Sequence, residues 1–178
     1  MRREGFLEVY RVMQDHLVDA ACAVMSDLSA EVVDVRDGSS IDLGTELVVS
    51  MVGYVADGCR GAIVVASAPS FLRASERGGG SLGDLADMQG EIANMLLGRL
   101  KLTMLKHGVT FVVTTPTSMV GTDVRLPPPK GGTSTWLRFG SAHGAFFVRF
   151  DVIFEPAFVL PALDARSGDA SEGDVLVF

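Results

Sequence analysis

The segment from residue 82 to residue 107 constrains the fold more than any other part of this sequence. Ser81 and Asp84 have the spacing of a capping box, in which each residue satisfies a backbone N–H of the other at a helix N-terminus. His107 suits the negative end of a helix dipole, and Gly108 can adopt the left-handed conformation that ends a helix. These signals predict a helix over 82–107. At 1.5 Å per residue it spans about 39 Å, so it crosses a whole domain.

The hydrophobic pattern predicts one further long helix and several strands. Apolar residues recur at intervals of three and four between residues 5 and 27, which predicts a helix there. A short helix is predicted at 69–76, and a loop at 125–135, where prolines and glycines exclude regular structure. Runs of β-branched and aromatic residues between turn signals predict strands at 31–36, 45–55, 59–66, 110–115, 136–139 and 145–154. This order favours an α+β fold, with long helices packed on an antiparallel sheet.

Two of these strands carry information about their place in the sheet. Pro116 cannot donate a hydrogen bond to a neighbouring strand, so the strand 110–115 is predicted to lie at a sheet edge or to change its pairing there. In the strand 145–154, apolar residues alternate with Arg149 and Asp151. One face of that strand is therefore predicted to be polar.

Composition limits the class of protein. The 178 residues, 48% of them hydrophobic, fit one globular domain, which we assign to 1–160, followed by an acidic tail at 161–178 that is expected to be mobile. A net charge of −7 argues against a nucleic-acid partner. The apolar runs fall short of the roughly 20 residues of a membrane span, and the N-terminus lacks the pattern of a signal peptide. We therefore expect a cytoplasmic protein that does not bind membranes.

The residue types that usually bind metals or cofactors do not form a recognisable pattern. Cys22 and Cys59 have no metal-ligand spacing. His16, His107 and His143 fall in different predicted elements, so solvated or capping histidines are expected. The glycine-rich stretch before the helix lacks the Lys-Ser/Thr ending of a phosphate-binding loop. No metal or nucleotide is expected on this chain.

One face of the predicted helix 82–107 carries residues that a purely structural helix would not need. Its apolar side holds Leu85, Met88, Ile92, Leu96 and Leu100, and its polar side holds Asp87, Glu91, Asn94, Gly98 and Lys101. A solvated face is the ordinary explanation for such a polar side. However, Asn is a poor helix former and an interior Gly costs about 1 kcal/mol relative to Ala, yet Asn94 and Gly98 stand one turn apart. Such a face suits the close approach of another protein's backbone, with an amide to position a ligand.

The run from Asp87 to Gly98 resembles the signature of the CheC/CheX/FliY family of chemotaxis phosphatases. That signature has an acidic residue or serine, then Glu-x-x-Asn on a long helix, then a proline about 22 residues beyond the Asn. Here Glu91 and Asn94 form the Glu-x-x-Asn, and Pro116 lies 22 residues after Asn94. The resemblance covers residues 5–155. Asn94 is the only asparagine in the chain, so one site is expected, which is closer to CheX than to CheC.

The resemblance implies a CheC-like/CheX-like fold and a phosphatase of two-component signalling. Its substrate would be the aspartyl phosphate of a phosphorylated CheY-like receiver protein, a response regulator that itself carries Mg²⁺. By analogy Glu91 pairs with a lysine of the receiver and the Asn94 carboxamide orients the attacking water, while Asp87, Gly98 and Lys101 contact the partner. A homodimer is also implied. The alternative is a non-catalytic receiver-binding or flagellar-switch-like module, which needs this helix face but not the amide of Asn94.

Overall fold

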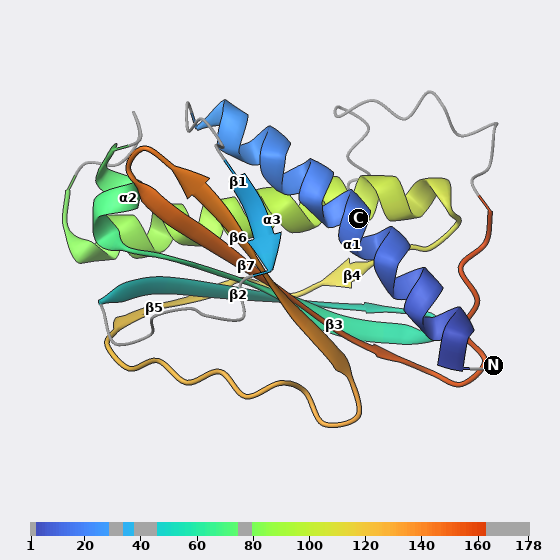
Figure 1. Cartoon of the computed structure of the whole chain (residues 1–178). Helices are drawn as coiled ribbons and strands as arrows, with labels where there is room; N and C mark the ends of the chain where they lie inside the picture. The colour runs from blue at the N-terminus through green and yellow to red at the C-terminus, as the bar shows by residue number, and fades with distance from the viewer. Residues whose placement is uncertain (1–2, 29–33, 38–45, 75–79, 163–178) are drawn as a thin grey trace.

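A computed structural model of the chain describes residues 3–28, 34–37, 46–74 and 80–162 (Figure 1). Its helices are α1 (Arg3–Asp27), α2 (Pro69–Ala74) and α3 (Leu82–Lys106). Its strands are β1 (Asp34–Asp37), β2 (Leu47–Ala56), β3 (Cys59–Ser67), β4 (Val112–Val113), β5 (Thr117–Gly121), β6 (Thr133–Ser141) and β7 (Gly144–Phe154). From residue 163 onward, the predicted tail lies outside the described residues.

The strands form one antiparallel sheet. Its order is β1-β6-β7-β3-β2-β4, and β5 also pairs with β2. The two central strands, β3 and β7, pair over nine residues each, from Cys59 opposite Phe154 to Ser67 opposite Phe146. This arrangement confirms the predicted α+β fold with an antiparallel sheet.

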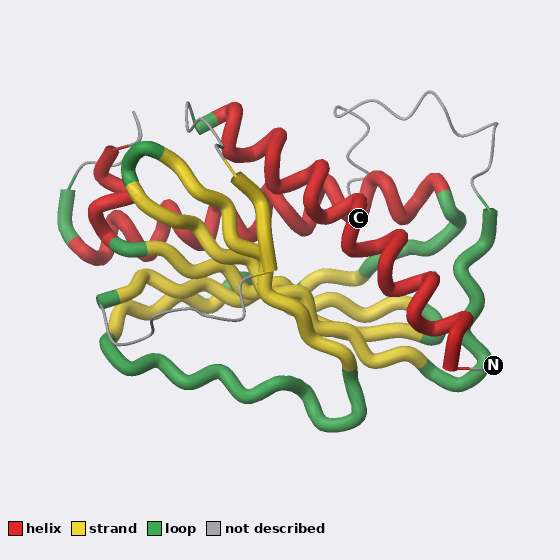
Figure 2. The backbone as a smooth tube through the Cα atoms, in the orientation of Figure 1, coloured by secondary structure: helices red, strands yellow, loops and turns green. Residues whose placement is uncertain are grey.

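Helices α1 and α3 lie side by side on one face of the sheet, and the main core fills the space between them and the strands (Figures 1 and 2). The apolar stripe of α3 and that of α1 are both buried there, with side chains such as Met13 and Leu17 fully enclosed. Tyr10 fastens α1 to β7, because its hydroxyl donates to the carbonyl of Phe150 at 3.2 Å. The predicted amphipathic helices are thus confirmed, each with its apolar side on the sheet.

The opposite face of the sheet is covered in part by the loop 122–132, which runs below the strands in Figure 2. From this loop Val124 and Leu126 pack on a second, smaller apolar cluster on the strands. The cluster consists of the buried residues Leu47, Val49, Val64 and Ala66, with Trp136 and Phe147 beside them. The proline- and glycine-rich segment therefore acts as a lid over the sheet's second face.

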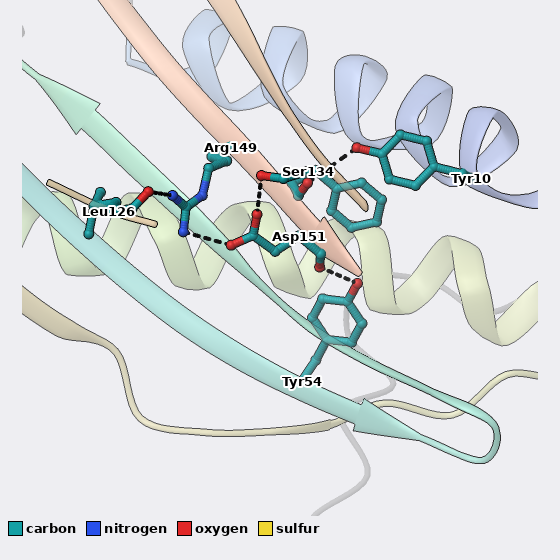
Figure 3. A network of polar contacts seen from close by, with 7 residues as sticks. Tyr10, Tyr54, Leu126, Ser134, Arg149 and Asp151 are labelled. Atoms are coloured by element: carbon teal, nitrogen blue, oxygen red, sulfur yellow. Dashed lines mark hydrogen bonds and ion pairs between the residues drawn. The ribbon is translucent and has the colours of Figure 1, made fainter. Parts of the chain in front are cut away.

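A buried ion pair on β7 lies between the sheet and this loop (Figure 3). The guanidinium of Arg149 contacts the carboxylate of Asp151 at 2.7 Å and donates to the carbonyl of Leu126 at 2.5 Å. The Ser134 hydroxyl donates to the same carboxylate, and Arg149 lies over the ring of Trp136 at 5.4 Å. The predicted polar face of β7 is indeed polar, but it is buried, because neighbouring strands and the loop supply partners for both charges.

The structure corrects two predicted elements and adds one strand. The predicted strand 110–115 is shorter in the structure, where only Val112 and Val113 form β4. The strand pattern ends at Thr114, whose N–H donates to the Gly53 carbonyl while its side-chain hydroxyl accepts from the Gly53 N–H. The chain then pairs again with β2 as β5, an element that the sequence pattern did not predict. Both segments lie at the sheet edge, as Pro116 indicated. The predicted loop 125–135 ends earlier, at residue 132, because β6 starts at Thr133 to pair with Val152.

The described part of the chain contains no helix that is both long and apolar enough to cross a membrane. Both cysteines are free thiols, with Cys22 half-buried and Cys59 buried. Burial raises the pKa of the Cys59 thiol to about 11. That thiol therefore stays protonated and unreactive near neutral pH.

We expect the loss of one partner of the Arg149–Asp151 pair to destabilise the protein strongly. Arg149→Met leaves the Asp151 carboxylate buried without its charge partner, and such a loss costs about 3–5 kcal/mol. Urea unfolding followed by circular dichroism measures this loss in the free energy of unfolding. The control Arg60→Met removes an exposed arginine of β3, and its effect should stay within about 0.5 kcal/mol. Equal stabilities for the two variants would contradict this account.

Candidate functional site on helix α3

Both ends of α3 are fixed by the predicted caps. At the N-terminus the Asp84 N–H donates to the Ser81 hydroxyl at 3.3 Å, and the Ser81 N–H donates to the Asp84 carboxylate at 2.6 Å. The Ser81 hydroxyl also donates to the Asp84 carboxylate, at 2.9 Å, and the two hydrogen bonds that this carboxylate accepts from Ser81 lower the pKa of Asp84. At the C-terminus Gly108 has φ +72°, and the N–H of Val109 donates to the carbonyl of Met104 at 3.0 Å, which is a Schellman motif. The caps fix the length of the helix and hence where its middle turns lie on the sheet.

The apolar side of α3 determines which residues face outward. Leu85, Ile92, Leu96 and Leu100 are at most 1% exposed, and Met88 is 8% exposed. On the opposite side Asp87, Glu91, Asn94 and Gly98 are exposed, and Lys101 is half-buried. The structure therefore brings the five predicted site residues to one helix surface.

The middle of this surface is unusually open. A Cβ atom added to Gly98 would meet no atom within 4 Å, so a partner's backbone can approach the helix closely there. Glu91 and Asn94 lie three residues apart, on neighbouring turns of the same face. An exposed carboxylate and an exposed carboxamide at this spacing can form an ion pair with a partner and hold a water molecule for it.

Pro116 returns to this helix although it is 22 residues beyond Asn94 in sequence. Its Cγ atom lies 3.8 Å from the position that a Cβ on Gly90 would occupy, and the Ser118 hydroxyl lies 3.1 Å from the same position. Gly90 is one helical turn before Asn94. The proline of the sequence pattern therefore stands beside the turn that precedes the candidate asparagine.

The outward face of helix α1 is mostly charged. Its outward residues Glu8, Arg11, Asp15 and Asp19 are exposed and include no amide that could match Asn94. At its C-terminal end Asp27 forms an ion pair with Arg99 of α3 at 2.5 Å. This contact explains Arg99, for which the sequence alone offered no reason.

The structure brings together two histidines that sequence spacing did not connect. His16 of α1 and His107, the C-cap of α3, approach with their Nε2 atoms 3.4 Å apart. His107 Nδ1 lies 2.8 Å from the carbonyl of Pro161 and donates its proton to that carbonyl. His107 is a capping histidine as expected, but it is buried, and the pair joins the two long helices. Only the tertiary packing of α1 on α3 could have revealed it.

No cluster of three or more His, Cys, Asp or Glu side chains suited to a metal occurs within the described ranges. The exposed face of α3 contributes carboxylates and an amide but no histidine or cysteine.

Comparisons with solved structures agree on the fold. A CheC-like superfamily protein from Shewanella sp. PV-4 superposes with a TM-score of 0.66 at 17% identity, covering 79% of this chain and 96% of that one. The chemotaxis protein CheX from Vibrio vulnificus gives 0.65 at 20% identity, covering 79% and 98%. The CheX–CheY–BeF3–Mg²⁺ complex from Borrelia burgdorferi gives 0.63 at 19% identity, covering 78% and 96%.

The chain therefore has the fold of the CheC-like and CheX proteins, as its sequence resemblance implied. No protein-family model and no curated protein matches the chain. The similarity to these solved structures shows the fold of the chain. The roles of individual residues on α3 rest on the geometry described above and on the sequence pattern.

The histidine pair predicts how stability depends on pH. Burial, then the neighbouring His107, lowers the pKa of His16, and Asp15 and Asp19 offset this only in part. The unfolded state therefore takes up a proton that the folded state resists. Stability should fall as the pH drops below about 6.5, until it reaches the folded pKa of His16.

The midpoints of urea unfolding at about pH 7.5 and pH 5.5 measure this loss of stability. The ordinary pKa of histidine lies between these two pH values. His16→Gln keeps a side-chain N–H donor but cannot titrate, so the variant should lose less stability than the wild type on acidification. Equal losses in the two proteins would show that His16 does not contribute.

Proposed function

We propose that this protein, within residues 1–160, is a phosphatase that hydrolyses the aspartyl phosphate of a CheY-like receiver domain in chemotaxis or another two-component circuit. The observation that carries the proposal is the exposure of Glu91 and Asn94 on a capped helix, with Pro116 against the preceding turn. The Borrelia burgdorferi protein of the same fold was crystallised with CheY, BeF3 and Mg²⁺, which supports a receiver as the partner.

In this mechanism Asn94 enters the receiver's active site and orients a water. The amide can accept a hydrogen bond from water and donate another without titrating, so it holds the water in line with the phosphorus. The water oxygen attacks phosphorus, the bond to the aspartyl oxygen breaks, and inorganic phosphate leaves with the aspartate restored. Mg²⁺ belongs to the receiver, where it neutralises charge on the phosphoryl oxygens.

The other exposed residues of α3 form the docking surface. Glu91 pairs with a lysine of the receiver, and Asp87 and Lys101 contact the partner on either side of it. Gly98 leaves room for the receiver's backbone, because nothing lies within 4 Å of the position of its missing Cβ. The site works in the cytoplasm, where receivers act.

We also infer a homodimer, as the resemblance to CheX implies. The sheet edge formed by β4 is apolar and exposed, with Val112 71% and Val113 44% exposed. Such an edge favours pairing with a second copy. Sedimentation velocity at micromolar concentration should show a dimer, and a monomer at that concentration would contradict this part of the proposal.

Asn94→Ala tests the catalytic step. The variant should bind the receiver within a few fold of wild type, because one amide–water hydrogen bond contributes only about 0.5–1.5 kcal/mol net. It should nevertheless abolish the acceleration of dephosphorylation, because the water is no longer positioned. Receiver dissociation constants and phosphate-release rates, measured on the same samples, separate the two effects.

Glu91→Ala is the matched comparison in the same assay. Removing one partner of an interface charge pair should weaken receiver binding as well as turnover, by about 2–5 kcal/mol if the pair is desolvated. High salt should reduce the difference from wild type if the pair is exposed at the rim. If Asn94→Ala and Glu91→Ala lose binding and turnover to the same extent, the proposed division of roles is wrong. If wild type binds the receiver without accelerating its dephosphorylation, the chain is a receiver-binding module instead.

A further inference from the structure

At Gly90, α3 packs closely against β5 and Pro116, beside the candidate site. Gly90 is buried, and a Cβ atom at this position would lie 3.1 Å from the Ser118 hydroxyl and 3.8 Å from Pro116 Cγ. The other α3 glycines differ. A Cβ on Gly83 would make only an ordinary contact at 3.4 Å, and one on Gly98 would make none within 4 Å.

The surface opposite Gly90 is held in place. The Ser118 hydroxyl donates to the Ser50 hydroxyl at 3.0 Å, and Ser50, which is fully buried, donates in turn to the carbonyl of Thr117 at 3.4 Å. Ser50 and Ser118 are also directly paired across β2 and β5. A Cβ at position 90 would therefore require the Ser118 hydroxyl or α3 to shift by a few tenths of an ångström.

Helix geometry links this contact to Asn94. Side chains on an α-helix incline toward its N-terminus, so a residue covers the turn before its own Cα. Asn94 follows Gly90 by four residues and thus projects over the turn at which Gly90 meets Pro116 and Ser118. Gly90 contributes no side chain to this corner, so α3 and the turn that precedes Asn94 pack close to Pro116 and Ser118.

We infer that Gly90 is a positioning residue, which sets the separation between the Asn94 carboxamide and the Pro116–Ser118 corner through its contact with the Ser118 hydroxyl. This inference rests on the proposed function for its catalytic consequence. Its structural content, the placement of Asn94, is independent of that function.

The sequence provides a direct probe, because Asn94 is the only asparagine. Protein labelled with ¹⁵N in asparagine alone gives one side-chain amide pair in a proton–nitrogen correlation spectrum. Gly90→Ala should shift that pair, and the control Gly83→Ala, the same change in the same helix, should not. The double variant Gly90→Ala/Ser118→Ala removes the obstructing hydroxyl and should return the pair to its position in Ser118→Ala.

The catalytic arm uses a phosphorylated receiver at varied concentration. Gly90→Ala should lower kcat about tenfold while KM stays within about twofold, because small misplacements of a catalytic group affect turnover more than binding. The double variant should recover kcat to within about twofold of Ser118→Ala. Urea midpoints of the same variants show whether any loss of activity follows from a loss of stability.

Two results overturn the inference: an unchanged Asn94 signal in Gly90→Ala, or a shifted signal and lowered kcat that the Ser118→Ala change does not restore. A different result tests the proposed function. If wild type fails to shorten the receiver's phosphate lifetime, the phosphatase proposal fails, and the spectra alone still decide whether Gly90 positions Asn94.

Discussion

The burial of one side of α3 against the sheet is the constraint on which the rest of the structure depends. Leu85, Ile92, Leu96 and Leu100 are almost fully enclosed, and each contributes about 1.5–3 kcal/mol when buried. This stripe fixes the rotation of the helix about its axis. Glu91 and Asn94 lie on the opposite side of the helix and therefore face outward. The candidate site is a consequence of the core rather than an addition to it.

The loop on the second face of the sheet is connected to the strand that contacts α3. The loop 122–132 starts directly after β5, and Arg149 holds it to the strands through the carbonyl of Leu126. β5 in turn carries Ser118, which meets α3 at Gly90. β5 thus packs against α3 on one face of the sheet, and the chain continues from β5 into the loop that covers the opposite face.

The helices, the hairpins and the exposed face of α3 could be predicted because their signals are local. Capping residues sit within three positions of each other at Ser81 and Asp84, and the buried and exposed sides of α3 follow from a 3.6-residue period. The sequence resemblance supplied the link from Pro116 to Asn94, and the structure shows its spatial form as the contact with Gly90.

What could not be predicted depends on contacts between distant segments. β5 has an unremarkable sequence and becomes a strand only because β2 pairs with it. From the sequence, Arg149 and Asp151 indicate only that one face of their strand is polar, and their burial depends on the distant loop 122–132. The His16–His107 contact likewise joins residues 91 positions apart. Propensity and periodicity carry no information about such pairings.

The measurement that tests the central claim most directly is the lifetime of the phosphoryl group on a receiver encoded near this protein. It is followed with Mg²⁺ present and with this protein at a small fraction of the receiver concentration. If the α3 face is catalytic, each molecule turns over many receivers, and the decay rate rises in proportion to the amount added. A lifetime that stays unchanged at every amount, although the two proteins form a complex, would contradict the account.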